Sequence, residues 1–176
     1  ANDGGDKVAR DELRASRGAA VTNRTWDGAT VRLSGARNEV LGFALLLEAG
    51  NGPVSNLAVA CPRLDGPGGA AIVSRVVTGA DLFTWTNRNI ELFLVRYLEI
   101  KGLSRLSYET YDERHIPQRF RRPWTGEGYG TGGWADRPDH NRFYPEIAVP
   151  LELAPSFAVA SGQCQMIWCD IYVPRD

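Results

Sequence analysis

The sequence predicts an all-β fold, an antiparallel β-sandwich of about eight or nine strands that carries one long irregular insertion rich in Arg and aromatic residues. Several segments alternate apolar and polar side chains with the period of two that a strand imposes. Turn residues separate these segments, since the 176 residues include 19 Gly and 10 Pro. No segment of about 12 residues shows the 3.6-residue period of an amphipathic helix.

The first half of the chain opens with two contrasting strand patterns. Residues 29–34 place Val31 and Leu33 on one side and polar residues on the other, which predicts a half-buried strand. Residues 38–48 are apolar on both sides, which predicts a strand covered on both faces. Shorter strands are expected at 54–61, 71–77 and 81–85.

The clearest strand patterns lie in the second half. Residues 91–100 are rich in the aromatic and β-branched side chains that favour strands. Residues 163–173 alternate almost without fault, and both parities are largely apolar apart from Asp170. We therefore expect a central strand between two layers, ended by Pro174. Shorter strands are expected at 147–153 and 157–159.

Two segments fall outside this strand pattern. Residues 1–28 are polar and mixed in charge, so we expect an N-terminal arm outside the core, with the sandwich domain at 29–176. Within that domain, residues 101–145 form a long loop region without an apolar period. Loops this long are uncommon in compact domains and are often functional.

The net charge of the chain argues against two classes of partner. A formal charge of −1 at pH 7 gives no field that attracts nucleic acid or an anionic membrane. No run approaches the roughly 20 apolar residues of a membrane span. We therefore expect no nucleic-acid partner and no direct membrane span.

The three cysteines leave two interpretations open. Cys164 and Cys169 lie five residues apart on one predicted strand, so they face opposite sides and cannot bridge each other. Cys61 is able to pair with either one, which would imply an oxidising compartment outside the cytoplasm, periplasmic or secreted. The other interpretation is three buried free thiols. Without a C-x-x-C motif, we expect no metal site and no cofactor.

The long loop region supplies the candidate binding residues. Aromatic rings beside Arg are typical of the centre of a protein interface, and they also suit the apolar face of a sugar. A third interpretation is a loop that simply covers one sheet. The candidate binding residues are Arg121, Arg122, Trp124, Tyr129 and Trp134.

Evidence for catalysis is weaker. The chain has no G-x-S-x-G motif, and its cysteines lie in or near apolar strands. His115 and His140, each with acidic residues nearby, leave a metal-dependent enzyme as an alternative. We expect no enzymatic activity and predict no catalytic residue.

A family resemblance rests on four segments in order. They are Ala36-Arg-Asn-Glu-Val-Leu-Gly-Phe43, Tyr97-Leu-Glu-Ile100, Phe143-Tyr-Pro-Glu146 with Val149-Pro150, and Gln165-Met-Ile-Trp-Cys-Asp-Ile-Tyr-Val-Pro174. Together they resemble the N-terminal β-sandwich domain of glycoside hydrolase family 123 and related bacterial proteins. In that family the sandwich is an accessory domain on a catalytic (β/α) barrel, and the barrel holds the catalytic acidic pair. The resemblance therefore implies a fold and no catalytic residue in this chain.

These observations combine into one expected function and two alternatives. We expect a non-catalytic, extracytoplasmic accessory or interaction domain that docks on another protein subunit or a downstream domain. The first alternative is a carbohydrate-binding module that holds a polysaccharide on its loop aromatics. The second is the metal-dependent enzyme.

Overall fold

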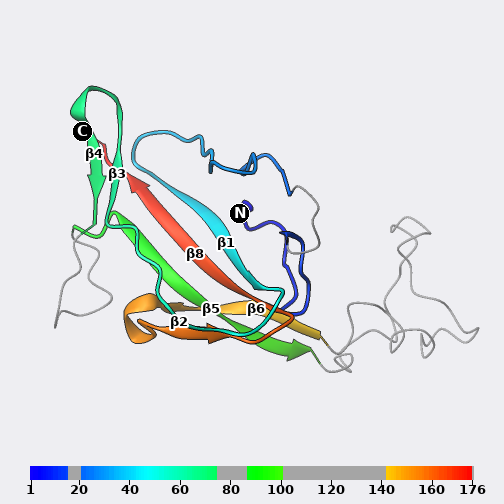
Figure 1. Ribbon diagram of the computed structural model, residues 1–176. Coiled ribbons are helices and arrows are strands. Elements are labelled where there is room, and N and C mark those ends of the chain that lie inside the picture. Colours follow the sequence, from blue (N-terminus) through cyan, green and yellow to red (C-terminus); the bar gives the residue numbers. More distant parts are fainter. Residues whose placement is uncertain (16–20, 75–86, 101–141, 176) are drawn as a thin grey trace, which may run out of the picture. The chain divides into compact units, whose positions relative to one another are not determined.

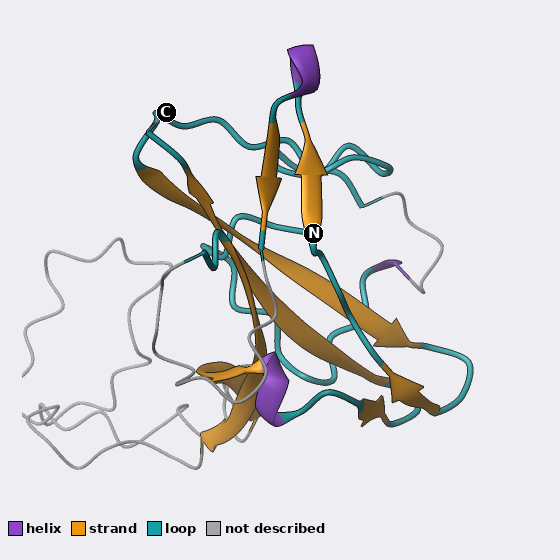
Figure 2. Cartoon of the chain, turned by 90° about the vertical axis from the view of Figure 1, so that its left-hand side faces the viewer, coloured by secondary structure: helices purple, strands orange, loops and turns teal. Residues whose placement is uncertain are grey.

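The computed structural model describes residues 1–15, 21–74, 87–100 and 142–175 (Figure 1). Within these residues the chain forms eight β-strands and no α-helix. Short 3₁₀ helices occur at Pro67–Gly69 and Leu151–Leu153 (Figure 2). Every strand pair with a determined register is antiparallel, which confirms the predicted all-β class. The packing of two sheets into a sandwich stays a prediction.

One four-stranded sheet organises the fold. Its strand order is β1-β8-β5-β6 (Figure 1), with β1 at Glu39–Ala49, β8 at Gln163–Val173, β5 at Ile90–Ile100 and β6 at Arg142–Pro150. Strand β8 pairs along its whole length with β1, and its second half pairs with the start of β5. The predicted central position of residues 163–173 is therefore confirmed.

Two further strand pairs are short. Strand β2 (Val54–Leu57) pairs with β7 (Phe157–Val159), and β3 (Arg63–Asp65) pairs with β4 (Ala71–Val73). The strand predicted at 54–61 is thus shorter than expected. The piece predicted at 81–85 lies outside the described residues.

The segment at 29–34 differs from its prediction, because it forms a turn and one isolated bridge instead of a strand. The Asp27 carboxylate accepts hydrogen bonds from the backbone N–H groups of Ala29 at 3.0 Å and Thr30 at 2.8 Å. These bonds fold the chain back, so that Val31 meets Trp26 in the isolated bridge. The segment does alternate apolar and polar side chains, but the turn pairs it with the residues just before it through one bridge and not with a neighbouring strand.

Strand β6 also differs in its bounds from the prediction of 147–153. It begins at Arg142, inside the predicted loop region, and ends at Pro150. Proline has no N–H to donate to a neighbouring strand, and the next three residues form a 3₁₀ helix.

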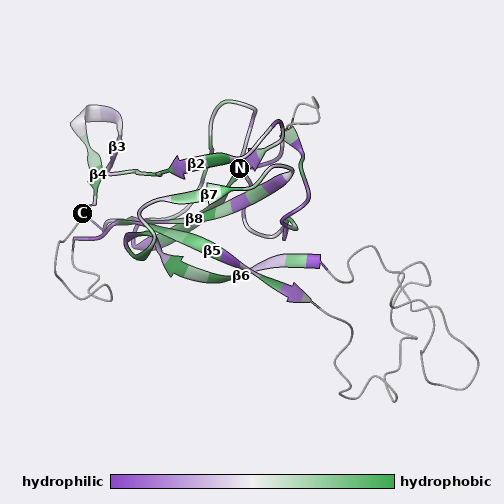
Figure 3. Cartoon of the chain, turned by 60° about the horizontal axis from the view of Figure 1, so that its bottom comes forward, coloured by the Kyte–Doolittle hydropathy of each residue, from purple (hydrophilic) through white to green (hydrophobic). Residues whose placement is uncertain are grey.

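Strand β8 is covered on both faces, as predicted. Cys164 and Met166 point to the first face, where Met166 packs with Ala44 and Val95. On the second face, Ile167 packs with Leu94, while Cys169 and Ile171 pack with Ile90. These β8 residues are at most 7% exposed, and Figure 3 shows much of β5 beside them in the hydrophobic colour.

The N-terminal segment differs from the expected polar arm, because part of it belongs to the core. Val8 is 1% exposed and Ala9 is fully buried. Asn2 exchanges two backbone hydrogen bonds with Ala44 of β1, at 2.8 and 2.9 Å, and the Arg10 carbonyl accepts one from the Cys164 N–H at 2.7 Å. Charged neighbours hid this short apolar pair in the sequence, and backbone bonds to the sheet fix it in place.

The chain divides into two compact units. One comprises Ala1–Leu98 with Pro145–Asp176, and the other comprises Glu99–Tyr144. The second unit spans nearly the same residues as the predicted loop region. The site below lies within the first unit. In the described part of the chain, no helix is long and apolar enough to cross a membrane.

Candidate functional site

The five predicted binding residues lie at 121–134, outside the described residues. The same holds for His115 and His140 of the metal alternative. The structure therefore does not place any of them. The described residues contain a different candidate site, on the first face of the four-stranded sheet.

This site is a cavity of about 320 Å³ where β5 begins and β8 ends. Its size falls at the lower end of the roughly 300–1,000 Å³ typical of ligand sites. Its lining combines charged, amide and aromatic groups: Val40, Asn87, Arg88, Asn89, Glu91, Asp170 and Tyr172. Such a mixture can fix the orientation of a ligand as well as bury it.

Two carboxylates from adjacent strands line the cavity. Glu91 of β5 lies directly opposite Asp170 of β8 in the strand register. Opposed residues share a face of the sheet, with Cβ atoms about 4.5–5.5 Å apart. Burial raises the pKa of both carboxyl groups, and the charge of Asp170 raises the pKa of Glu91 further. The site thus holds two acidic groups close enough for the charge of Asp170 to act on Glu91.

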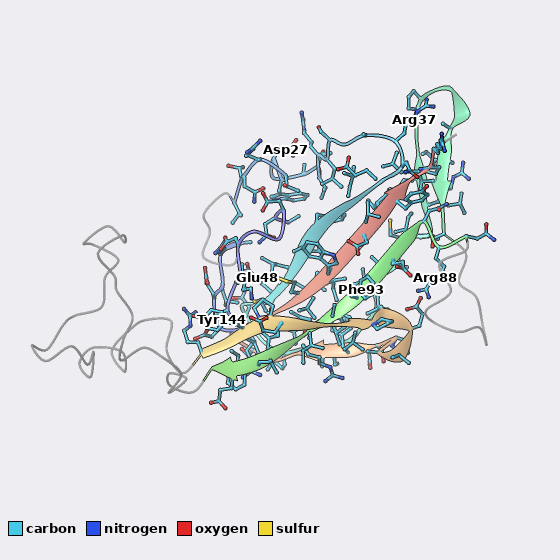
Figure 4. All side chains as sticks on the ribbon, turned by 180° about the vertical axis from the view of Figure 1, so that it is seen from behind. Asp27, Arg37, Glu48, Arg88, Phe93 and Tyr144 are labelled. Carbon is cyan, nitrogen blue, oxygen red and sulfur yellow. The ribbon has the colours of Figure 1, made fainter. Side chains whose placement is uncertain are left out.

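Arg88 links this pair to a third carboxylate. Its Nε lies 3.2 Å from Glu91 Oε1, and its terminal nitrogen donates to Glu152 Oε1 at 2.6 Å. The side chains of Arg88 and Glu91 are both only 8% exposed. Figure 4 shows Arg88 close to the start of β5. The positive charge of Arg88 lowers the pKa of Glu91, which partly offsets the effect of burial.

Asp170 is held by a neighbouring indole. Trp168 Nε1 donates a hydrogen bond to Asp170 Oδ1 at 2.7 Å, and this bond opposes the rise in the pKa of Asp170. The indole fits because two nearby residues are glycine. A Cβ at Gly42 would lie 2.5 Å from Cζ2 of the ring, and one at Gly4 would lie 2.2 Å from Cζ3. Because glycine has no side chain, these two positions leave the room that the indole needs in order to reach Asp170.

The rim of the cavity is more apolar than its floor. Tyr172 lies opposite Val40 in the register of β8 and β1, and Val40 is 55% exposed. Tyr172 Oη donates to Asn38 Oδ1 at 2.9 Å, which anchors the ring at the end of the sheet. The site thus combines an exposed apolar side chain, Val40, with a buried Glu91 and a half-buried Asp170.

A second cavity of about 220 Å³ lies beside the Arg88 side chain and includes Cys61 in its lining. All three cysteines are free thiols, and burial raises the pKa of each, that of Cys169 to about 12. Cys61 packs in the same cluster as Cys169, on the second face. Cys164 lies on the first face, where its Sγ donates to the Ala9 carbonyl. The structure contains no disulfide among these three residues, and the packing would leave Cys169 as the partner for the Cys61 bridge that the sequence left open.

Part of this site is marked in the sequence by two acidic residues in apolar strands. Asp170 interrupts the apolar parity of β8, and Glu91 stands at the start of an equally apolar strand. An acidic residue in a covered strand requires a partner. Only the register of β5 and β8 shows that the two are neighbours. Among the described residues, no group of three or more His, Cys, Asp or Glu is placed to hold a metal ion.

Comparisons with known proteins do not assign a family. No protein-family model matches the chain, and no curated protein matches it. The resemblance to the family 123 sandwich domain therefore rests on the four sequence segments and stays a hypothesis.

Proposed function

We propose that this chain is a non-catalytic β-domain that works outside the cytoplasm by docking on another protein or domain. The observation that carries the proposal is the cavity where β5 begins and β8 ends, which combines the buried Glu91 and the half-buried Asp170 with the exposed Val40. The residues that dominate binding at protein interfaces cluster in desolvated pockets of this kind. The cellular location is a separate part of the proposal and does not rest on the three cysteines, which are free thiols in the structure.

The contacts within the cavity favour recognition over turnover. Arg88 holds Glu91, and Trp168 holds Asp170, so that each carboxylate has a fixed position. Binding sites gain affinity when their polar groups are positioned before the partner arrives. Because both groups project from paired strands, the sheet itself supplies that rigidity.

The loop residues form a second, independent part of the proposal. A stable interface buries about 1,200–2,000 Å² in total, which is more than one small cavity supplies. We therefore keep Trp124 and Trp134, with the arginines and tyrosine near them, as further contact residues. Loss of a central Trp from an interface costs about 2 kcal/mol or more.

Co-purification with cross-linking from the native host tests the docking function. The wild-type chain should recover one protein in near-stoichiometric amount, and the Trp124→Ala/Trp134→Ala variant should recover much less. Trp26→Ala, which changes a tryptophan outside the loop region, is the matched control and should retain the complex. The absence of a stoichiometric partner for the wild type would refute docking. Undiminished recovery by the double variant would remove the two loop tryptophans from the interface.

A carbohydrate-binding module remains the second candidate, favoured by the pairing of aromatic rings with Arg in the loop region. Affinity electrophoresis on a panel of polysaccharides separates it from protein docking. Retardation that disappears in the Trp124→Ala/Trp134→Ala variant would favour glycan binding. Unretarded migration on every polysaccharide would eliminate it.

A further inference from the structure

We propose that the cavity where β5 begins and β8 ends receives an arginine side chain from the docked partner. This inference rests on the proposed docking function and adds the chemistry of the contact. The guanidinium group would lie between the carboxylates of Glu91 and Asp170, with its aliphatic stem against the rim.

The charges of the described residues favour a cation. Among the residues that line the cavity, Arg88 supplies one positive charge, while Glu91 and Asp170 supply two negative charges, which leaves one in excess when both are ionised. Arg88 is also engaged with Glu152, a carboxylate outside the lining of this cavity. The hydrogen bond from Trp168 to Asp170 comes from a neutral donor and adds no positive charge. A bound cation would offset the excess, whereas a bound anion would increase it.

The shape and chemistry of the cavity favour arginine over other cations. Its planar guanidinium has five N–H donors, enough to bridge two carboxylates on adjacent strands. The apolar rim formed by Tyr172 and Val40 suits the three methylene groups of the stem. Arginine is also among the residues enriched at the energetic centres of interfaces. A lysine would bring the same charge with a less suitable arrangement of donors.

Amide chemical shifts of the ¹⁵N-labelled full chain test the inference, with acetyl-arginine-amide as the probe. Acetyl-citrulline-amide is the matched control, because citrulline has nearly the same shape without the charge. We expect dose-dependent shifts at Glu91, Asp170 and Tyr172 and at the indole N–H of Trp168. The expected dissociation constant is on the order of millimolar, as befits a ligand of this size. Citrulline should bind at least about tenfold more weakly.

Two conservative variants locate the binding site. Asp170→Asn keeps an oxygen that accepts from Trp168, and Glu91→Gln keeps the shape of the side chain. Each should weaken the binding of acetyl-arginine-amide at least about tenfold, since each removes one of the two facing charges. Asp65→Asn, which neutralises an exposed carboxylate on β3, should leave affinity unchanged. If Glu91→Gln fails to fold, Asp170→Asn decides the question alone.

The outcomes separate this inference from the proposed function. Equal affinity for arginine and citrulline, or undiminished binding by Asp170→Asn, would overturn the inference. So would the absence of shifts at the cavity in tens of millimolar probe, about tenfold above the expected dissociation constant. If the arginine probe fails while the wild-type chain still recovers its partner, docking stands and the arginine contact falls. If the probe binds at the cavity and no partner is recovered, docking falls.

Discussion

Replacing Gly42 with alanine tests how the sheet builds the site. The new Cβ would lie 2.5 Å from Trp168 Cζ2 and 3.1 Å from Asp170 Oδ1. The rigid indole has little room to retreat, because the Gly4 backbone lies close to another part of the ring. The substitution should therefore displace the indole and break its 2.7 Å hydrogen bond to Asp170.

The expected cost follows from two contributions. Overpacking of this kind costs about 1–3 kcal/mol. A lost hydrogen bond to a charged group adds about 1.5–3 kcal/mol. The two overlap, because the same ring movement relieves the clash and breaks the bond. We therefore expect a loss of about 2–4 kcal/mol in the free energy of unfolding.

Urea unfolding of purified variants measures this cost, and the indole N–H resonance of Trp168 reports the hydrogen bond directly. Gly66→Ala is the matched control, because its new Cβ would meet nothing closer than 3.5 Å and its φ is −111°. The same Gly42→Ala change in a Trp168→Ala background should cost less than about 1 kcal/mol, since the clash with the ring is gone and only the 3.1 Å approach to Asp170 Oδ1 remains. A loss below about 0.5 kcal/mol in the wild-type background, with an unchanged indole resonance, would refute the reasoning.

Three further predictions concern ionisable groups. The pKa values of Glu91 and Asp170 are raised in the folded state, so the folded protein binds more protons than the unfolded chain. The free energy of unfolding measured in urea should therefore fall as the pH rises above about 4–5, and Glu91→Gln should reduce that fall. Arg88→Met leaves buried carboxylate charge uncompensated and should lower the free energy of unfolding in urea by about 3–5 kcal/mol. Arg63→Met, at an exposed ion pair, should lower it by about 0–1 kcal/mol, and equal losses in the two variants would contradict the burial argument. In a thiol-reagent assay of the native protein, Cys61 should react first and the two β8 cysteines only on unfolding, and fast reaction of all three would show that β8 is not covered.

The elements that could be predicted from the sequence are those whose signal is local. Residues 163–173 and 91–100 show their strand character in their own composition, and the apolar parities of the former also gave its central position. The segment at 29–34 shows the limit of that method, since alternation predicts which faces are apolar and does not supply a partner strand. The buried pair Val8–Ala9 was missed because backbone hydrogen bonds to distant residues hold its segment against the sheet.

The candidate site could not be predicted for the same physical reason. Glu91 and Asp170 lie 79 positions apart in the chain and meet only through the register of two strands. No spacing within the sequence encodes that register, because it is set by side-chain packing on both faces of the sheet. The role of Gly42 was hidden in the same way, since the ring that needs its missing side chain belongs to another strand. Asp170 and Glu91 were each visible in the sequence only as a separate charge in an apolar strand.

A crystal structure of the full chain with acetyl-arginine-amide is the most direct test of the central claim. The account predicts Glu91 and Asp170 on the same face of neighbouring strands, with guanidinium nitrogens about 2.7–3.2 Å from both carboxylates. An arginine bound elsewhere, or the two carboxylates on opposite faces of the sheet, would contradict it.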